Sequence, residues 1–368
     1  MAVSTHTSQR FPGLIGKKYT KMTPVNRDWD FESLVSRGVV YNEHGSYVAR
    51  PFEKFFNFEE VFNCETLELT ELGKMLKQYP DHPMLYPNTE GPYRVMDKLD
   101  GSLGIAFHWN GQWHVKTGGG FDSPEAIFAT KFLRENVNTS NMDSDYTYCF
   151  EIIWLDDEYA HPLTHFYDKD ELVLIGVISN MTGVELDTDA LLATADRIGT
   201  RLAEIIEITD LDDIYNYAKS LPSNKEGVVV TTKSGFKFKI KGHEFLKLQK
   251  LFHGINKDYV IENFSGGKYT GAPIPEELTG ILDYIKLIET KYEYALVESI
   301  GIADEMTQKF VLADRKLAWE WLCEHTKEGT NVFNGFIINL WAGKVGDQMT
   351  LPPRDKFDIC YRKWLKEK

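Results

Sequence analysis

The sequence has few cysteines and no long apolar run. Its four cysteines are far apart and form no Cys-x-x-Cys pair, which argues against a disulfide framework and a cysteine-based zinc site. No uncharged apolar stretch reaches the roughly 18 residues of a transmembrane helix, so no membrane association is expected. The first residues do not combine a basic region with an apolar one. We therefore expect no secretory signal and a cytoplasmic protein.

Basic residues are in the minority. The chain of 368 residues carries 41 Lys and Arg against 55 Asp and Glu, a formal net charge of −14. This balance argues against a protein that coats nucleic acid non-specifically, although it permits a local basic groove. Hydrophobic residues make up 42% of the chain, enough for a large core in two domains.

The first two thirds of the chain predict an α+β domain. Up to about residue 240, short strand-like runs alternate with turn residues and a few helical stretches, a pattern typical of antiparallel sheet with helices. Two hairpins are expected, at 107–116 with an Asn-Gly turn and at 228–241 with a Ser-Gly turn. Helices are expected at 123–136 and 188–197, because each begins beside a residue that caps a helix.

The last third has helical periodicity. We therefore predict a first domain over residues 1–253 and an all-helical domain over 254–368. RNA binding by exposed lysines of the second domain is a hypothesis. The aromatic and apolar stripes of this region are expected to be packing residues: Tyr284, Leu287, Ile288, Tyr292, Leu317, Trp319 and Trp321.

One strand-like stretch, VMDKLDGSLGI (95–105), is interrupted by a lysine and two aspartates. Asp100 and Gly101 form a pair that suits a tight turn, and a strong strand pattern follows. Lys98 therefore lies at or just before a turn, from which its side chain can project into a cleft. Taken alone, the pattern favours a solvated turn lysine.

A second stretch aligns lysines on one strand face. In FKFKIK (236–241) the aromatic and aliphatic residues share one face, and the other face carries Lys237, Lys239 and Lys241. Residues 233–250 hold six lysines against one glutamate. Like charges aligned on one face repel one another unless an anion binds there. A phosphate-bearing ligand is therefore a natural partner. Taken alone, an amphipathic strand with a solvated lysine face remains the simpler interpretation.

The order of four segments carries more information than any one of them. It resembles the nucleotidyltransferase motifs of ATP-dependent polynucleotide ligases and mRNA capping enzymes: KLDGS (98–102), FE (150–151), EGVVV (226–230) and KFKIK (237–241). Two upstream segments resemble more narrowly the RNA ligase 1 family of bacteriophages, named for the enzyme of phage T4: SRGVVYNEHG (36–45) and RPFEKFFNF (50–58). The resemblance covers roughly residues 30–250.

The resemblance implies a nucleotidyltransferase fold and a three-step reaction. ATP adenylates a lysine and releases pyrophosphate, the AMP passes to an RNA 5′-phosphate, and an RNA 3′-hydroxyl displaces the AMP. The implied partner is RNA with 5′-phosphate and 3′-hydroxyl ends, the implied cofactors are ATP and Mg²⁺ with Mn²⁺ as a substitute, and the implied setting is RNA repair by a monomer, in the host cytoplasm for a phage protein. The 1–253 domain would be the adenylyltransferase.

The resemblance also assigns residue roles. The catalytic set is Lys98, Lys239, Lys241 and Glu226. The set that contacts ATP consists of Arg37, Lys54, Lys98, Asp100, Gly101, Lys116, Glu151, Glu226, Lys239 and Lys241. The metal would be held by Glu226 and Glu151, partly through water.

The chemistry of the first step constrains Lys98. Only a neutral amine attacks phosphorus, and a lysine of pKa ~10.4 is neutral in about one molecule in a thousand near pH 7.4. We therefore expect the site to lower the pKa of Lys98. Lys239, Lys241 and a bound metal would do so, because like charge disfavours the ammonium form.

The sequence departs from the family at one place and leaves alternatives open. Where phage T4-like relatives carry a second basic residue, Lys116 is followed by Thr117 and Gly118. Another residue would then supply the missing contact, or the ligand would be held differently.

A DNA ligase or a capping-type guanylyltransferase is one alternative function. The helical tail argues against it, because it lacks the two-residue periodicity of the β-barrel module that those enzymes carry. A phage tail-fibre assembly factor with a nucleotide-binding fold is another.

Overall fold

The structure is a computed structural model. It describes residues 2–155, 167–254, 257–271, 274, 279–310, 315–326, 331–345 and 354–366. The chain divides into two compact units, Met1–Leu248 and Gln249–Lys368. This division lies inside helix α8 (His243–Gly254), as does the predicted boundary after residue 253. No helix in the described ranges combines the length and the apolar character that crossing a membrane requires.

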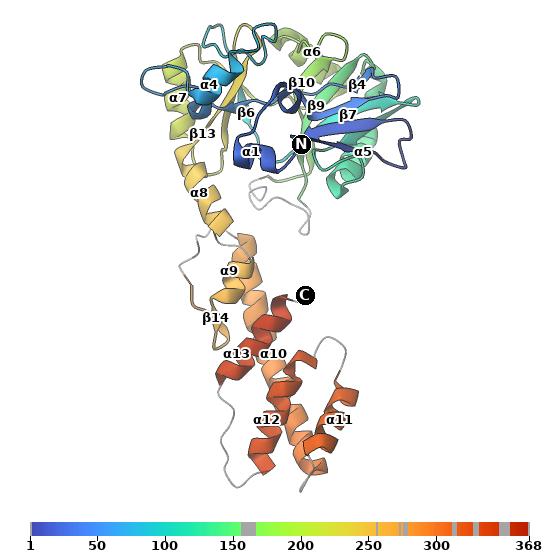
Figure 1. The fold of residues 1–368 in the computed structure, drawn as a ribbon, viewed down its shortest axis with the longest axis vertical. Helices are drawn as coiled ribbons and strands as arrows, with labels where there is room; N and C mark the ends of the chain where they lie inside the picture. Colours follow the sequence, from blue (N-terminus) through green and yellow to red (C-terminus); the bar gives the residue numbers. More distant parts are fainter. Residues whose placement is uncertain are drawn as a thin grey trace. The chain divides into compact units, whose positions relative to one another are not determined.

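The first unit is built on three sheets (Figure 1). The N-terminal sheet has the order β1 (Val3–His6), β2 (Ile15–Tyr19), β3 (Arg37–Tyr41) and β4 (Tyr47–Ala49). What we call the roof sheet has the order β10 (Glu171–Ser179), β9 (Tyr146–Ile153), β7 (Ser102–Trp109) and β8 (Gln112–Lys116). What we call the floor sheet has the order β11 (Ile205–Ile206), β6 (Arg94–Lys98), β12 (Gly227–Thr231), β13 (Lys237–Lys241) and β5 (Phe56–Asn57).

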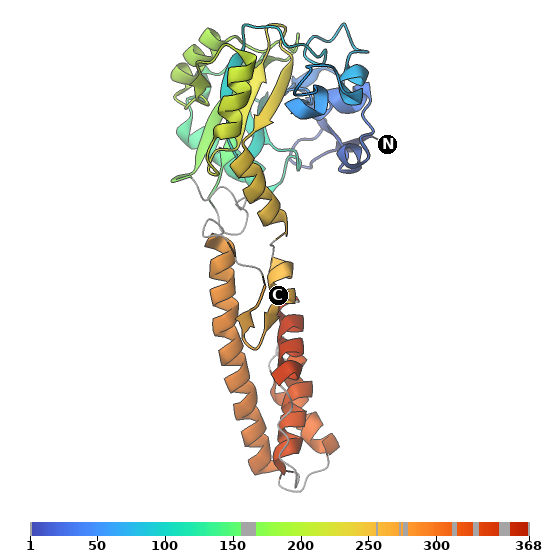
Figure 2. The same cartoon turned by 90° about the vertical axis from the view of Figure 1, so that its left-hand side faces the viewer.

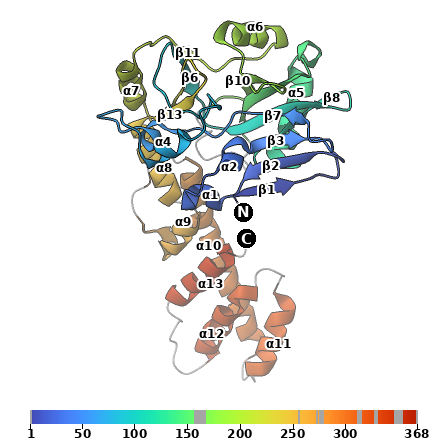
Figure 3. The same ribbon diagram turned by 45° about the horizontal axis from the view of Figure 1, so that its top comes forward.

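The sheets lie in two groups within this unit. Figure 3 shows β1, β2 and β3 following one another beside β7, with β6 and β13 apart from them. All strand pairs of the three sheets are antiparallel except β13 with β5, which is parallel. Because the roof and floor sheets are separate, their facing side chains can enclose a cavity.

Helices cover the sheets where the sequence predicts them. Helix α5 (Pro124–Asn136) begins after Ser123, whose side chain accepts the backbone N–H of Ala126. Helix α6 (Thr188–Ile198) is capped in the same way by Asp187. Helix α7 (Leu211–Ser220) packs on β12 and β13. The shorter helices of this unit are α1 (Met22–Asn26), α2 (Phe31–Val35), α3 (Phe58–Val61), α4 (Glu71–Leu76) and the 3₁₀ turn η1 (Thr139–Asn141).

Both predicted hairpins are present. Asn110 and Gly111 join β7 to β8 with φ angles of 50° and 78°, the left-handed conformation that a two-residue hairpin turn requires. Strand β12 pairs with β13 from Gly227↔Lys241 to Thr231↔Lys237. As the alternation predicts, the apolar face of β13 is buried in the core between the floor sheet and its helices, through Phe236, Phe238 and Ile240.

The second unit is mainly helical, and the predicted α+β class with a helical C-terminal region is confirmed. Figure 2 shows the long helix α10 running alongside the other helices of the unit. The unit also contains a short hairpin, β14 (Phe264–Ser265) with β15 (Lys268–Tyr269), which the sequence reading missed. Its helices and 3₁₀ turn are α9 (Lys257–Glu262), α10 (Thr279–Lys309), α11 (Arg315–His325), η3 (Asn331–Phe333), α12 (Asn334–Val345) and α13 (Arg354–Lys366).

The core of this unit contains buried polar contacts. Tyr292 Oη donates to Asp358 Oδ1 at 2.6 Å, and Tyr361 Oη donates to the Ile288 carbonyl at 2.6 Å. The packing role expected for Tyr292 and Ile288 is therefore observed. It is wrong for Leu287, Leu317 and Trp319, which are 48%, 56% and 41% exposed.

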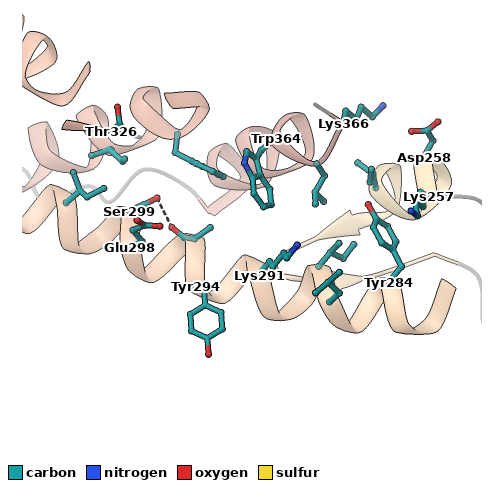
Figure 4. A pocket seen from close by; sticks show the side chains of 18 of the residues that line it. Lys257, Asp258, Tyr284, Lys291, Tyr294, Glu298, Ser299, Thr326, Trp364 and Lys366 are labelled. Atoms are coloured by element: carbon teal, nitrogen blue, oxygen red, sulfur yellow. Dashed lines mark hydrogen bonds between the residues drawn. The ribbon is translucent and has the colours of Figure 1, made fainter. Parts of the chain in front are cut away.

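A cavity of about 820 Å³ lies within the second unit, between α9, α10 and the end of α13 (Figure 4). Its walls are mostly aliphatic and aromatic, and charged groups of both signs also line it: Lys257, Asp258, Lys291, Glu298 and Lys366. Lys366 pairs with Glu262 at 3.3 Å, and both side chains are half-exposed.

Candidate active site

A second cavity, of about 210 Å³, lies between the floor and roof sheets of the first unit. Five residues predicted for the site line it: Arg37, Lys98, Gly101, Glu151 and Lys239. Glu226 and Lys241 adjoin it, because Glu226 contacts both Lys98 and Lys241. The structure thus brings together side chains that are up to 204 positions apart in the chain.

The register of the floor sheet arranges residues in and beside this cavity in three rows. Residues directly opposite one another on β6, β12 and β13 form the first row (Lys98, Gly227, Lys241), the middle row (Met96, Val229, Lys239) and the third row (Arg94, Thr231, Lys237). Alternate residues of a strand lie on the same face, so successive rows are about 6.7 Å apart and the first and third rows about 13 Å apart. The first and third rows are polar, and the middle row is largely apolar.

Lys98 stands at the end of β6 in an ionic cluster. Its Nζ lies 2.6 Å from Glu226 Oε2, and Lys241 Nζ lies 2.9 Å from Glu226 Oε1. Burial alone would lower the pKa of Lys98, but the carboxylates of Glu226 and Glu151 outweigh it and raise the pKa above its ordinary value. The expected lowering is therefore wrong for the protein alone, because the two acidic side chains are nearer to the amine than the sequence could show.

Glu151 faces Lys98 from the roof sheet. Its Oε1 accepts the backbone N–H of Gly101 at 3.0 Å. Burial, with a contribution from Glu226, raises the pKa of Glu151 to about 7 although Lys98 opposes the shift. This carboxyl group therefore changes its protonation state near neutral pH.

The segment after Lys98 is a link between two sheets. Strand β6 belongs to the floor sheet and β7 to the roof sheet, so Leu99, Asp100 and Gly101 cross between sheets where the sequence suggested a tight turn. The Asp100 N–H donates to Tyr167 Oη at 3.0 Å. Gly101 is needed for space: a Cβ atom there would lie 2.4 Å from the Ile152 carbonyl oxygen on β9.

Two further cations lie around the cavity. Arg37 stacks on the Phe55 ring, with the guanidinium carbon 4.5 Å from the ring centre. Its Nη1 is buried and has no hydrogen-bond partner among the described residues. Burial and the neighbouring charges of Lys98 and Lys241 lower the pKa of Lys239 to about 8. A buried donor without a partner and a cluster of positive charges both suit an anionic ligand.

Lys54 and Lys116 do not line this cavity. Lys54 Nζ donates to the Phe55 carbonyl at 2.8 Å, and its pKa is lowered to about 7 by burial and by Lys239. Lys116 is fully buried and donates to the Gly38 and Thr117 carbonyls at 3.3 and 2.9 Å. Burial lowers its pKa to about 7 as well.

The position that departs from the relatives has a basic neighbour from another strand. Gly118 is an open position, where an added Cβ atom would contact nothing within 4 Å. Lys18, on β2, donates to the Gly118 carbonyl. A cation is therefore present beside Gly118 even though the hairpin itself does not supply it.

The sequence indicates only one member of the third row, Lys237, through the lysine face of β13. Lys237 lines the same cavity as Lys98, and its Nζ lies 2.6 Å from Glu185 Oε2. The alternation of FKFKIK places Lys237 on the correct face, but no local pattern indicates Glu185 or Arg94 as its neighbours. The apolar residues Val229 and Ile175, which also line the cavity, were not assigned either.

The acidic residues of the cavity fit a hard divalent ion only in part. No group of three or more His, Cys, Asp or Glu side chains in the described ranges is placed to hold a metal by itself. Glu226 and Glu151 are carboxylates of the kind that Mg²⁺ prefers, and Mg²⁺ normally completes its shell with water and phosphate oxygens. This donor set therefore fits a metal that arrives together with a phosphate ligand.

The chain is similar in sequence to a known viral protein. A putative bifunctional polynucleotide kinase/RNA ligase from Autographa californica nuclear polyhedrosis virus is 24% identical over 237 residues, which are 61% of this chain and 32% of that protein. The chain thus spans about a third of the length of this relative.

Solved structures show weaker likeness. An archaeal ATP-dependent RNA ligase is 15% identical with a TM-score of 0.47, covering 82% of this chain and 76% of that one. A putative ATP-dependent DNA ligase from Aquifex aeolicus is 16% identical with a TM-score of 0.46, covering 83% of this chain and 72% of that one.

A family model described as RNA ligase matches residues 35–245. Because this match takes in more than half of the chain, including Lys98, Glu226 and the lysines of β13, the chain belongs to the RNA ligase family.

Proposed function

We propose that this protein is an ATP-dependent RNA ligase that works through a covalent lysine–AMP intermediate on Lys98. The observation that carries the proposal is the position of Lys98 in the first row, in contact with Glu226 and facing a cavity that also presents Lys239 and Arg37. A nucleophilic amine beside phosphate-binding cations is the arrangement that nucleotidyl transfer requires.

In the first step the neutral amine of Lys98 attacks the α-phosphorus of ATP. A nitrogen–phosphorus bond forms, the bond to the bridging oxygen breaks, and pyrophosphate leaves. The amine must lose a proton, and the nearest acceptor is Glu226, 2.6 Å away. A bound Mg²⁺ or Mn²⁺ would supply charge that stabilises the phosphates and lowers the pKa of Lys98 by engaging Glu226.

The other cations would hold the triphosphate. Arg37 offers a buried N–H that has no other partner among the described residues, and an arginine donates well to phosphate oxygens. Lys239 and Lys241 lie on the same face of β13, where they would stabilise negative charge in the transition state. Lys54 and Lys116 would act from outside the cavity, by supporting the segments that carry Arg37 and Gly38.

The remaining steps transfer AMP and join RNA. An RNA 5′-phosphate oxygen attacks the phosphorus on Lys98, an anhydride bond forms, and the nitrogen–phosphorus bond breaks as Lys98 regains a proton. An RNA 3′-hydroxyl then attacks the 5′-phosphorus, forms a 3′,5′-phosphodiester and releases AMP. We place these reactions in residues 1–253 of a monomer, within an RNA repair process in the cytoplasm, with the helical region as a separate domain.

Incubation with α-labelled ATP or GTP and Mg²⁺, followed by a denaturing gel, tests the proposal. Wild-type protein and the control Lys291→Ala should retain label from ATP alone, and Lys98→Ala should retain none. The label should be stable in base and labile in acid, and transfer to RNA with a 5′-phosphate should follow. Protein free of pre-bound AMP that takes label from neither nucleotide would refute the ligase assignment.

A further inference from the structure

Lys237, at the far end of the active-site cavity, belongs to a buried ionic cluster that lysine adenylation does not use. Glu185 Oε2 lies 2.6 Å from both Arg94 Nη2 and Lys237 Nζ. The three side chains are only 9% to 11% exposed. Lys237 also donates to Thr231 Oγ1 at 2.6 Å. Burying three charged groups is costly, so their position beside the cavity calls for an explanation.

The three rows of the floor sheet give the direction of a bound nucleotide. An AMP attached to Lys98 has its phosphorus at the first row. The apolar Met96 and Val229 of the middle row lie below the cavity, and Ile175 lines it from the roof sheet. A flat aromatic base fits between these apolar side chains. Its edge farthest from the ribose then points toward the third row, about 13 Å from the first.

Lys237 offers a hydrogen-bond donor at that edge. A lysine ammonium has three N–H groups, and those of Lys237 are used by Thr231 Oγ1 and Glu185 Oε2. No hydrogen-bond acceptor for the third is found among the residues that the structure describes, and the ammonium lies 5.1 Å from the centre of the Phe52 ring. Burial lowers the pKa of Lys237 to about 8, although Glu185 opposes the shift, so the group is still mostly a charged donor at pH 7.

We propose that Lys237 recognises the nucleobase of ATP by donating a hydrogen bond to adenine N1. This inference rests on the proposed function. The atom N1 lies on the edge of adenine farthest from the ribose and accepts a hydrogen bond, whereas N1 of guanine carries a hydrogen. A donor fixed at this point therefore favours ATP over GTP in the adenylation step.

Glu185 and Arg94 are positioning residues for Lys237. Arg94 Nη1 donates to the Leu186 carbonyl at 2.9 Å, which ties the cluster to the segment that carries Glu185. Glu185 in turn restricts the ammonium of Lys237 to one side of the third row. Without this partner a long, flexible lysine side chain would lose entropy on meeting the base.

Adenylation rates with ATP analogues test the proposal, with covalent product detected by intact-protein mass spectrometry. Replacing N1 by C–H in 1-deaza-ATP removes the acceptor, so kcat/KM for adenylation of the wild type should fall about tenfold or more, as expected for a hydrogen bond to a charged group. The analogue 7-deaza-ATP should react like ATP. Equal rates with ATP and 1-deaza-ATP would overturn the inference.

A substitution connects the effect to Lys237. Lys237→Met should lower kcat/KM for ATP and should react equally with ATP and 1-deaza-ATP, whereas the control Lys233→Met, at an exposed lysine of the same hairpin, should discriminate as the wild type does. A Lys237→Met protein that keeps the discrimination overturns the inference. If this variant does not fold, Glu185→Gln replaces it and should reduce the discrimination. Wild-type protein that ATP itself does not adenylate refutes the proposed function instead.

Discussion

Two of this protein's cavities, one in each unit, differ in size and in how far their charged groups are exposed to solvent. The cavity in the second unit is about 820 Å³, and its ion pair between Lys366 and Glu262 is half-exposed. The cavity in the first unit is about 210 Å³, and its cluster around Glu226 is nearly excluded from solvent. Water and salt strongly screen exposed charges such as those of Lys366 and Glu262. They screen the buried charges around Glu226 only weakly.

This difference shows why the smaller cavity is the better candidate for chemistry. A charge acts strongly on a reacting group only where water is excluded. Size alone would direct attention to the helical unit, but desolvated, mutually shifted groups such as Lys98, Glu151 and Lys239 occur around the smaller cavity.

The largest effect is expected for Glu226→Gln. The amide cannot balance the charges of Lys98 and Lys241, so single-turnover adenylation should fall about 10²–10³-fold. Lys291→Met, in the larger cavity, should leave the rate unchanged. If the lysine substitution slowed adenylation and the glutamate substitution did not, the comparison of the two cavities would be reversed.

The next largest effect is expected for Gly101→Ala. The added methyl group would collide with the Ile152 carbonyl, from which it would be 2.4 Å away, and such overpacking lowers the free energy of unfolding by about 1–3 kcal/mol. Urea denaturation measures the loss. Gly118→Ala is the control because its Cβ atom would contact nothing within 4 Å, and similar losses in both variants would contradict the crowding at Gly101.

The pH dependence of stability should come partly from Lys116. Its pKa is about 7 in the folded protein because it is buried, against about 10.4 in an unfolded chain. Between these values the unfolded chain binds a proton that the folded one does not, so stability rises with pH by up to about 1.4 kcal/mol per unit.

Urea denaturation at pH 7, 8 and 9 tests this dependence. Lys116→Met should show a smaller rise in stability with pH than the wild type. Its stability relative to that of the wild type should therefore be highest at pH 7. Lys291→Met, at an exposed lysine, should keep the wild-type rise. Parallel curves for the wild type and Lys116→Met would argue against a buried, partly neutral Lys116.

The smallest effect is expected in the helical unit. Tyr292→Phe removes the hydrogen bond to Asp358 and should destabilise this unit by about 1 kcal/mol, without changing adenylation. Tyr294→Phe, at a side chain that is 74% exposed, should change neither. Thermal unfolding and the adenylation assay distinguish these outcomes, and slower adenylation in Tyr292→Phe would show that the units are coupled.

Local patterns in the sequence predict much of the first unit. The Asn110-Gly111 turn, the cap at Ser123 and the two faces of β13 depend on residues that are neighbours in the chain, and all three are present. The helical character of the last third is likewise a matter of local periodicity. The order of the motifs also predicts that Lys98 and Glu226 belong to the same site.

Long-range packing decides what these patterns cannot. The pKa of Lys98 depends on how closely Glu226 and Glu151 approach it, and the sequence gives no distance. Nothing near Glu185 in the chain indicates that it meets Lys237 and Arg94. The exposure of Leu317 and Trp319 was misjudged for the same reason, because periodicity shows that a stripe exists but not what covers it.

The link from Lys98 to Gly101 has a mechanical consequence. Lys98 is fixed to Glu226 through the pairing of β6 with β12, and Gly101 is fixed to Glu151 through the roof sheet. Only Leu99 and Asp100 lie between these two rigid attachments. Any motion that separates the two sheets must therefore bend the chain at these two residues, directly beside Lys98.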